Sequence, residues 1–250
     1  MIKALSVSDL SLSIGGAKIL DGISLSVNQN EVLGIIGPNG AGKTSFFNLL
    51  SGVRKPTRGE IHIGEQDVTH MKPYERANVG LARTFQTSSI FANLTCLENV
   101  RIAAQAANGK SMNLTKNAYK FSDVVAHAHE CLAKVGLAPR AMQIAGSLSH
   151  GDKRRLEIAI VLASKSDIVL LDEPMAGMSV ENVPELVEII RSLKVDNQKT
   201  VLIVEHHLEV ILGLADRIAV LNYGELLVCD TPQNVINNPV VQSAYIGEAL

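Results

Sequence analysis

Apolar and polar residues alternate along the first third of the chain, in short runs that are broken by turn-forming residues. The alternating runs are Leu5–Val7, Leu10–Ile14, Ile23–Val27 and Glu60–Ile63. Beside them stand the turn residues Gly15-Gly16, Asp21-Gly22, Asn28-Gln29-Asn30 and Gly64. A period of two is typical of strands with one buried face, and closely spaced turns join such strands as hairpins. The pattern predicts an antiparallel N-terminal sheet in which each of these turns ends a strand.

Three later segments are almost continuously apolar, namely Glu31–Ile36, Asp167–Leu171 and Thr200–Val204. Runs of this kind are typical of parallel strands that are buried on both faces. Apolar residues at helical spacing over Val183–Leu193 predict a helix between the last two strands, and hence a strand–helix–strand unit. A parallel sheet is therefore expected at the centre of the fold.

The middle of the chain has a helical pattern. It runs from Leu97 to Gln143 and is interrupted by the polar stretch Asn108–Asn117, which predicts a loop. Together the patterns predict an α/β fold with a mostly parallel sheet core, an antiparallel N-terminal β-subdomain and a helical section inserted near residues 87–150. Length alone, at 250 residues, does not decide between one large domain and two small ones.

Composition narrows the class of protein. A hydrophobic content of 46% with 19% charged residues is that of a globular chain, and the net charge of −2 provides no basic surface for nucleic acid. The three cysteines are widely spaced and odd in number, which favours free thiols in a reducing compartment. We find no signal-peptide pattern and no apolar run of membrane-spanning length, so a soluble chain is expected.

The segment Gly37–Thr44 fits the phosphate-loop pattern G-x-x-x-x-G-K-[ST]. Glycines allow successive backbone N–H groups to turn toward phosphate oxygens, the lysine reaches the β- and γ-phosphates, and the threonine hydroxyl coordinates Mg²⁺. An ordinary glycine-rich turn is the alternative, but a buried strand before the loop and a helix over Lys43–Leu50 provide the context that the motif requires. The predicted nucleotide-binding residues are Gly37, Pro38, Asn39, Gly40, Ala41, Gly42, Lys43, Thr44 and Ser45.

Two adjacent carboxylates, Asp172 and Glu173, end the second of the buried strands. Successive side chains on a strand point in opposite directions, so the two need not share a role. One can hold Mg²⁺ while the other orients or deprotonates a water for attack on the γ-phosphorus. An isolated pair of this kind is more often a solvated strand end, but a phosphate loop in the same chain favours the catalytic interpretation.

Ser149 and Asp152 stand at the start of a third helical pattern, where they predict a capping box. Together with Gly151, the exposed N–H groups of such a helix start also form a second surface that favours an anion. One nucleotide does not need two such sites on one chain, which indicates that this site serves a partner subunit.

Single residues add weaker signals. His206 follows the Thr200–Val204 strand at a position suited to a γ-phosphate, whereas His207 is expected to face the other way. A lone histidine there is more often structural. Gln86, where the sheet region gives way to helices, means nothing taken alone.

In this order and spacing, the motifs resemble the ATP-binding subunit of ABC transporters over essentially the whole chain. They are the phosphate loop at 37–44, Gln86, L-S-x-G at 148–151, D-E-P at 172–174 and His206. The resemblance implies the P-loop NTPase fold of ABC ATPases, as a single ATP-binding domain over residues 1–250. It implies the cofactors ATP and Mg²⁺, and ATP hydrolysis coupled to transport across a membrane.

The same resemblance implies roles for the site residues. Glu173 would be the general base, His206 would contact the γ-phosphate and Gln86 would help to arrange the attacking water. The metal would be held by Thr44, Gln86 and Asp172. Ser149 and Gly151 would close the site of a homologous subunit in a head-to-tail dimer.

Finer features resemble the subfamily that serves uptake of branched-chain amino acids, amides and urea. They are Leu81–Gln86, Ala176–Ser179, Val204–His206 and Val241–Gly247. Such systems pair two different ATPase subunits with two membrane permeases and an external solute-binding protein, at the cytoplasmic face of a prokaryotic inner membrane. The surface from Gln86 through the helical section would meet a cytoplasmic helix of the permease.

Three alternatives stay open at this point. An exporter of lipid or lipopolysaccharide shares the hydrolytic motifs and differs only in those finer segments. A soluble ABC protein that acts on DNA or ribosomes would normally bring a coiled coil, a second ATPase domain or basic patches. A regulator that binds ATP without hydrolysis is disfavoured by the intact Lys43, Asp172, Glu173 and His206.

The chain also departs from the family pattern at four positions. His150 and Asp152 replace residues of the usual L-S-G-G-Q signature, and Asp152 adds negative charge near the partner's nucleotide. Ser179 stands where an aspartate is common. Ile14 stands where an aromatic residue usually stacks on adenine, which predicts weaker discrimination between bases.

Overall fold

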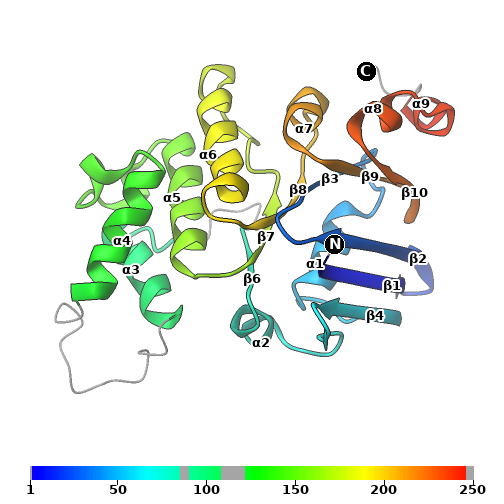
Figure 1. Ribbon diagram of the computed structural model, residues 1–250, viewed down its shortest axis with the longest axis horizontal. Coiled ribbons are helices and arrows are strands. Elements are labelled where there is room, and N and C mark those ends of the chain that lie inside the picture. Colours follow the sequence, from blue (N-terminus) through cyan, green and yellow to red (C-terminus); the bar gives the residue numbers. More distant parts are fainter. Residues whose placement is uncertain (1, 85–89, 108–121, 246–250) are drawn as a thin grey trace.

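The computed structural model describes residues 2–84, 90–107 and 122–245, which form two sheets and a set of helices (Figure 1). Gln86 and the predicted loop at Asn108–Asn117 lie outside the described residues. In chain order the elements are β1 (Lys3–Ile14), β2 (Ala17–Asn28), β3 (Val32–Ile36), α1 (Lys43–Leu50), β4 (Arg58–Ile63), β5 (Gln66–Asp67), α2 (Pro73–Asn78), β6 (Leu81–Arg83), α3 (Cys96–Ala107), α4 (Ser122–Lys134), α5 (His150–Ala163), β7 (Ile168–Asp172), α6 (Val183–Val195), β8 (Thr200–Val204), α7 (Leu208–Leu214), β9 (Arg217–Asn222), β10 (Glu225–Asp230), α8 (Pro232–Ile236) and α9 (Pro239–Tyr245).

The N-terminal sheet is antiparallel, with strand order β2-β1-β4-β5, as the alternating pattern predicts. The prediction of a turn at Asp21-Gly22 is wrong, because β2 runs through these residues without a break. The pairing register with β1 shifts here, from Leu10↔Ile23 to Leu12↔Leu20, and Gly22 has a φ of +65°. The dipeptide therefore forms a bulge inside one long strand, a role that glycine's access to positive φ also permits.

The second sheet has the order β10-β9-β3-β8-β7-β6, and all its neighbouring pairs are parallel except β9–β10. Strands β3, β8 and β7 are adjacent, and each is fully buried, as the continuous apolar runs predict. Parallel neighbours end at the same edge of a sheet. The loop after β3 begins at Gly37, the loop after β8 at Glu205 and the loop after β7 at Glu173. All three loops therefore start at one edge of the sheet.

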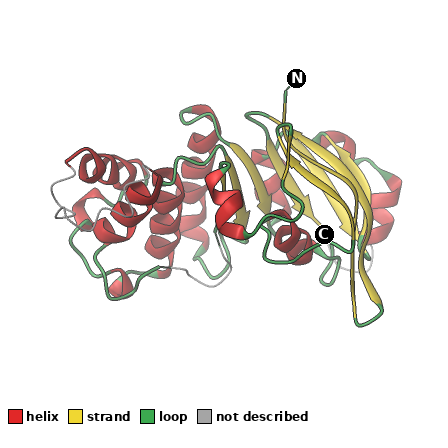
Figure 2. Ribbon diagram, turned by 90° about the horizontal axis from the view of Figure 1, so that it is seen from below, coloured by secondary structure: helices red, strands yellow, loops and turns green. Residues whose placement is uncertain are grey.

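The interior consists of two apolar clusters on opposite faces of the parallel sheet. Because side chains alternate along a strand, Leu33 and Leu202 join the cluster that contains α1 and the N-terminal sheet. Val32 and Val201 join the other cluster, with helices α3 to α7. Figure 2 shows the strands gathered at one end of the molecule and most helices at the other. Helix α1 is thus enclosed between the two sheets.

Helices α3, α4 and α5 form the helical part of the molecule and share apolar residues of one cluster (Figure 1). Helix α5 begins after Ser149, whose hydroxyl accepts a hydrogen bond from the Asp152 N–H at 3.2 Å. Of the predicted capping box, the N-cap bond is present, whereas the Asp152 carboxylate accepts from the Ser149 hydroxyl at 2.7 Å instead of from the Ser149 N–H. Within the described residues, no helix is long and apolar enough to cross a membrane.

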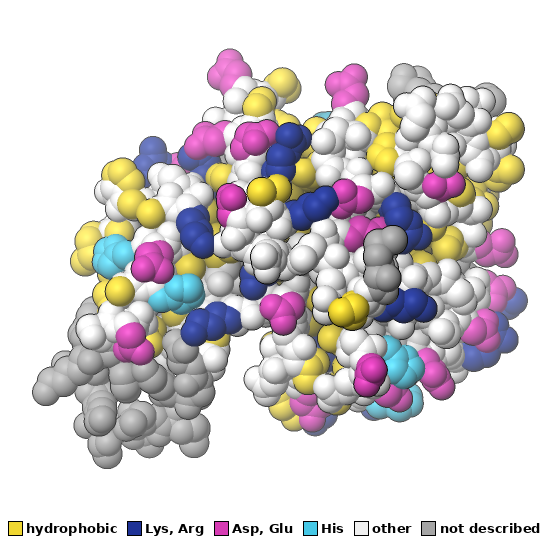
Figure 3. All heavy atoms as spheres, viewed as in Figure 1, with side chains coloured by type: hydrophobic (Ala, Val, Ile, Leu, Met, Phe, Trp, Pro, Cys, Tyr) yellow, Lys and Arg dark blue, Asp and Glu magenta, His cyan; other side chains and the backbone are white. Residues whose placement is uncertain are grey.

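The surface agrees with the balanced composition. On the face drawn in Figure 3, lysine and arginine side chains are interspersed with aspartate and glutamate side chains. Cys96 and Cys131 are buried and Cys229 is half-buried, and all three are free thiols, as their spacing predicts.

Arg76, in α2, is a buried cation that ties α2 to the end of α1. Its guanidinium donates to the carbonyls of Leu49 (2.5 Å), Leu50 (2.7 Å), Thr69 (2.9 Å) and Met71 (3.2 Å). Two of these carbonyls lie in the last turn of α1, where a positive charge also complements the helix dipole. Burial lowers the pKa of Arg76 to about 10. The interaction fixes the far end of the helix that begins at the phosphate loop.

We expect Arg76→Met to lower the free energy of unfolding by about 3 kcal/mol or more, because four carbonyls lose their donor. Urea unfolding monitored by circular dichroism measures this loss. Arg54→Met removes an exposed arginine from the loop after α1 and serves as the control, with an expected change within about 0.5 kcal/mol. Equal losses in the two variants would contradict the stabilising role of Arg76.

Candidate functional site

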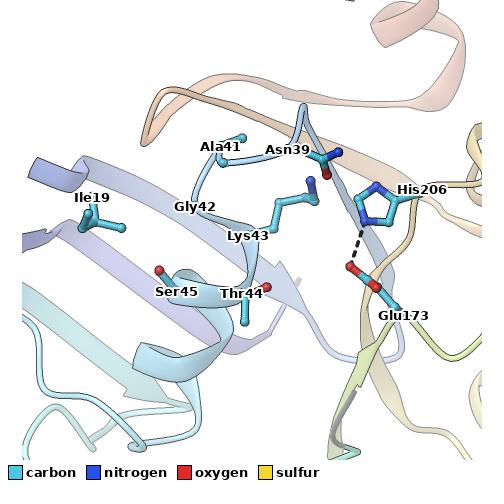
Figure 4. A pocket seen from close by; sticks show the side chains of 10 residues that line it. Ile19, Asn39, Ala41, Gly42, Lys43, Thr44, Ser45, Glu173 and His206 are labelled. Carbon is cyan, nitrogen blue, oxygen red and sulfur yellow. Dashed lines mark hydrogen bonds and ion pairs between the residues drawn. The ribbon is translucent and has the colours of Figure 1, made fainter. Parts of the chain in front are cut away.

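A cavity of about 300 Å³ opens at the edge of the parallel sheet where β3, β7 and β8 end. Figure 4 shows the side chains around it. The residues that line it are Ile19, Asn39, Gly40, Ala41, Gly42, Lys43, Thr44, Ser45, Glu173 and His206. Most of the predicted phosphate loop therefore lies in one cavity with a predicted base and the predicted histidine.

The phosphate loop is held in a conformation that requires glycine. Gly42 has a φ of +99°, and a Cβ there would lie 2.5 Å from the Leu20 side chain. The N-terminus of α1 follows directly, and its first residues line the cavity, where helix N–H groups favour an anion. Lys43 is buried, and its ammonium donates to the carbonyls of Gly37 (2.5 Å) and Pro38 (3.0 Å). The loop is thus shaped for an anion before one binds.

Glu173 and His206 point toward each other across the cavity (Figure 4). The distance from Glu173 Oε1 to His206 Nε2 is 2.8 Å, and the glutamate side chain is 14% exposed whereas the histidine is 46% exposed. Glu173 has a φ of +47°, in the left-handed region that is costly for a residue other than glycine. His207 does not line the cavity, as expected. The strained backbone of Glu173 therefore coincides with a carboxylate that faces the phosphate loop.

Glu205 is a residue of the site that the sequence motifs do not reveal. Its buried carboxylate accepts hydrogen bonds from the N–H groups of Met175 (2.8 Å) and His206 (3.2 Å). Burial raises the pKa of Glu205, and these two N–H groups act in the opposite direction. The side chain joins the loop after Glu173 to the loop after β8, so it positions both members of the Glu173–His206 pair. An acidic residue before a motif histidine is the only sequence signal for this role.

Asp172 is separated from its neighbour Glu173, as strand geometry predicts. It is 1% exposed, and its Oδ2 lies 2.7 Å from Nη2 of Arg83. Its other carboxylate oxygen, Oδ1, is buried and has no hydrogen-bond partner among the described residues. An orphaned buried carboxylate oxygen fits a metal ligand, since its desolvation is otherwise uncompensated.

The donor set matters for which metal fits. Within the described part of the chain, no group of three or more His, Cys, Asp or Glu side chains could hold a metal alone. Mg²⁺ is commonly bound through one or two carboxylates together with substrate phosphates and water. The combination of the orphaned Asp172 oxygen with the Thr44 hydroxyl near a phosphate cavity therefore fits Mg²⁺ bound together with a nucleotide.

Comparison with known proteins identifies the family. The ABC transporter family profile matches residues 20–176, which is more than half of the chain. The chain belongs to the ABC transporter family. As an ABC ATPase, it binds nucleotide and hydrolyses ATP.

Full-length relatives of this ABC ATPase have transport roles. It is 38% identical over 250 residues, 98% of each chain, to LivG of Salmonella typhimurium, a high-affinity branched-chain amino acid transport ATP-binding protein. It is 35% identical, with the same coverage, to BraF of Pseudomonas aeruginosa, which carries the same description. It is 31% identical over 244 residues, 98% of this chain and 97% of the relative, to LptB of Haemophilus influenzae, a lipopolysaccharide export system ATP-binding protein.

The predicted ABC ATPase fold is confirmed by solved structures. An ATP-binding cassette of an ABC transporter in its ADP conformation matches with a TM-score of 0.87 and 30% identity, over 99% of this chain and 100% of that one. A nucleotide-free cassette matches with a TM-score of 0.85 at the same identity and coverage.

Ser149 and Gly151 do not line the cavity of their own chain, and Ser149 is exposed. The Ser149 hydroxyl donates to Asp152 Oδ2 at 2.7 Å, and the same carboxylate oxygen accepts a hydrogen bond from Arg140. Arg155 lies 3.9 Å from the other Asp152 oxygen. The negative charge that Asp152 adds to the ABC signature is therefore balanced by neighbouring arginines, which the sequence pattern does not show.

The aliphatic residue at the rim of the ABC nucleotide cavity is Ile19, whereas Ile14 lies at the end of β1, is 42% exposed and does not line the cavity. Among the described residues that line the cavity, none is phenylalanine, tyrosine or tryptophan. The prediction that base stacking is weak does not depend on which isoleucine is nearer to the base.

We expect ATP to bind less than a hundredfold more tightly than GTP, because stacking adds only about 0.5–1.5 kcal/mol and no Phe, Tyr or Trp lines the described part of the cavity. Competition of each nucleotide against a fluorescent ATP analogue measures the two affinities. Ile19→Tyr should widen the difference, and a preference above a hundredfold in the wild type would contradict the prediction.

Glu205→Leu should lower the free energy of unfolding by about 1–3 kcal/mol, because two N–H groups lose their buried acceptor. Thermal or urea unfolding measures the change. Glu209→Leu, in the exposed first turn of α7, removes the same charge without a buried partner and should stay within about 0.5 kcal/mol. A Glu205→Leu variant as stable as the Glu209→Leu control would exclude the anchoring role.

Proposed function

We propose that this ABC ATPase energises an importer of a small solute, either branched-chain amino acids or amides and urea. The observation that carries the hydrolytic role is the 2.8 Å contact of Glu173 with His206, facing the phosphate loop in one cavity. The importer role is supported by likeness over 98% of the chain to LivG and BraF, which are described as branched-chain amino acid transport proteins.

In the proposed reaction, the N–H groups of the phosphate loop and Lys43 bind the phosphates of ATP. The Glu173 carboxylate accepts a proton from a water whose oxygen attacks the γ-phosphorus, and the bond to the β-phosphate oxygen breaks to release ADP. His206 holds Glu173 through Nε2, and an arriving γ-phosphate would compete for that ring nitrogen. Transfer of the His206 hydrogen bond from the carboxylate to the phosphate would let Glu173 Oε1 accept a hydrogen bond from the water.

Mg²⁺ is proposed as the cofactor, held by the Thr44 hydroxyl, Asp172 Oδ1 and the phosphates. When bound, it would neutralise charge that develops on the phosphate oxygens. Gln86 is proposed to complete the arrangement of metal and water. Asp172 is buried beside the cavity-lining Glu173, which supports a ligand role for it instead of a role as base.

The proposed partner in hydrolysis is a homologous ATPase subunit in a head-to-tail dimer. Ser149 is exposed and precedes a helix of 14 residues, so the start of α5 can be reached by an anion from outside the chain. The Ser149 hydroxyl would exchange its hydrogen bond to Asp152 Oδ2 for one to that anion. Gly151 follows within the first turn. The partner is either a second copy or a paralogue, and the resemblance to the uptake subfamily favours a paralogue.

The proposed membrane partner is a permease, with a solute-binding protein outside the cell. Phe91, Met142 and Ile144 are 57%, 73% and 46% exposed. Their segments lie side by side, because Ile144 pairs with Thr95 and the Gly146 N–H donates to the Ala92 carbonyl at 2.8 Å. Exposed apolar side chains that lie together in this way suit a cytoplasmic permease helix. In this proposal the chain lies peripherally at the cytoplasmic face of a prokaryotic inner membrane.

An exporter of lipopolysaccharide or lipid is the second candidate, since LptB is a relative at 31% identity over nearly the same length. The higher identity to LivG, 38%, favours the importer. Interspersed acidic and basic side chains on the face in Figure 3 provide no support for a soluble ABC protein that binds nucleic acid.

Affinity capture of the tagged chain from gently solubilised native membranes tests the importer. Two polytopic permeases and a second ATPase are expected among the proteins identified by mass spectrometry. Recovery with lipid-export components would replace the importer with the exporter. Recovery with ribosomes or DNA would leave only the ATP chemistry.

Glu173→Gln should reduce ATP turnover by at least a hundredfold and leave ATP affinity within about threefold, because the amide cannot accept the proton of the attacking water. Phosphate release and fluorescent nucleotide binding measure the two effects. Glu181→Gln changes an exposed carboxylate nearby and should have wild-type turnover. Wild-type turnover in Glu173→Gln would remove this residue from the mechanism.

A further inference from the structure

Arg83, the last residue of β6, connects three separate elements through one buried guanidinium. Its Nη2 lies 2.7 Å from Asp172 Oδ2, at the end of β7. Its Nη1 donates to Asn48 Oδ1 in α1 and to Ser51 Oγ just after α1, both at 2.8 Å. The guanidinium also lies 5.7 Å from the centre of the Phe47 ring. The side chain is 6% exposed, so these contacts are made away from bulk water.

The arginine divides the two oxygens of Asp172. Oδ2 is committed to Arg83, whereas Oδ1 is buried with no hydrogen-bond partner among the described residues. A guanidinium has its donors in a rigid planar fork, so it can fix a carboxylate while also bonding to a second group. The orientation of Asp172 is thereby tied to α1, the helix that begins at the phosphate loop.

This arrangement constrains how Asp172 can bind a metal. With Oδ2 hydrogen-bonded to Arg83 and Oδ1 without a donor among the described residues, the carboxylate is arranged to bind a metal through Oδ1 alone. Mg²⁺ requires near-ideal octahedral geometry, whereas Ca²⁺ accepts six to eight oxygens and often takes both oxygens of a carboxylate. A carboxylate that is restricted to one oxygen therefore suits the smaller cation.

We propose that Arg83 is a positioning and metal-selectivity residue, which restricts Asp172 to one metal-facing oxygen and so favours Mg²⁺ over Ca²⁺ in the nucleotide complex. The inference rests on the proposed Mg²⁺-ATP site and concerns a residue outside the phosphate loop and the catalytic pair. Arg83 also ends the strand that leads to the segment of Gln86, so the metal ligand, α1 and that strand are joined at a single side chain.

A purely structural ion pair is the competing explanation. Removing one partner of a buried pair destabilises a protein whether or not the pair serves a ligand. Such a role predicts lower thermal stability in Arg83 variants, with an unchanged ratio between the ATP affinities measured in Mg²⁺ and in Ca²⁺. The positioning role predicts that this ratio falls.

The test is Arg83→Lys in the full chain, with binding of a fluorescent ATP analogue measured in EDTA, Mg²⁺ and Ca²⁺. Lysine keeps the charge and loses the fork, so it cannot hold Asp172 and α1 together. We expect affinity in EDTA within about threefold of the wild type, and a Mg²⁺-to-Ca²⁺ affinity ratio at least about tenfold lower, as for loss of a group that orients a metal ligand.

Ser51→Ala is the matched control, because it removes one contact of Arg83 and leaves the Arg83–Asp172 pair in place. Its ratio should stay within about threefold of the wild type. Arg83→Gln provides a second variant if Arg83→Lys does not fold, and the same fall in the ratio is expected since one amide cannot bridge Asp172 and α1. Circular dichroism and the thermal midpoint establish folding for each variant.

The outcomes separate the two proposals. If the wild type binds the analogue more tightly in Mg²⁺ than in EDTA and the folded variants keep the wild-type ratio, the inference about Arg83 is wrong and the proposed function stands. If the wild type gains no affinity from Mg²⁺, the proposed metal site fails and the inference fails with it.

Discussion

The hydrogen bonding of β3, β8 and β7 as adjacent parallel strands is the constraint on which the rest of the structure depends. Parallel pairing aligns the carboxyl ends of these strands, so loops that are far apart in the chain begin at one edge. The phosphate loop, the Asp172–Glu173 pair and the Glu205–His206 pair each follow one of them. A slip of one residue in any strand would exchange its buried faces and move its chemical group out of the cavity.

Local patterns account for the parts that could be predicted from the sequence. The phosphate loop is read from glycine spacing, the three central strands from continuous apolar runs, and the start of α5 from Ser149. Each depends on residues that are close together in the chain. Asp21-Gly22 shows the limit of such patterns, because a turn and a bulge both use glycine at positive φ, and pairing with β1 decides between them. Gln86 lies outside the described residues, so its role stays a prediction.

The residues that were missed act over long distances in sequence. Arg83 meets Asp172 across 89 positions, and Glu205 meets Met175 across 30. Arg140 meets Asp152 across a turn that no periodicity describes. Arg83 and Glu205 lie in segments that resemble the uptake subfamily, but nothing in those segments shows which residues they contact. Their contribution is to orient motif residues, and orientation depends on tertiary contacts that a linear pattern cannot contain.

The parallel sheet also divides the interior into two compartments. Helix α1 packs on one side with the N-terminal sheet, whereas α3, α4 and α5 pack on the other. A side chain that becomes larger or smaller in one cluster shifts the residues that it contacts directly, because cores are tightly packed. The strands lie between the two clusters, so such a shift reaches the other cluster through the strands. A substitution in the helical compartment, which would face the proposed membrane partner, can therefore leave the packing around the phosphate loop unchanged.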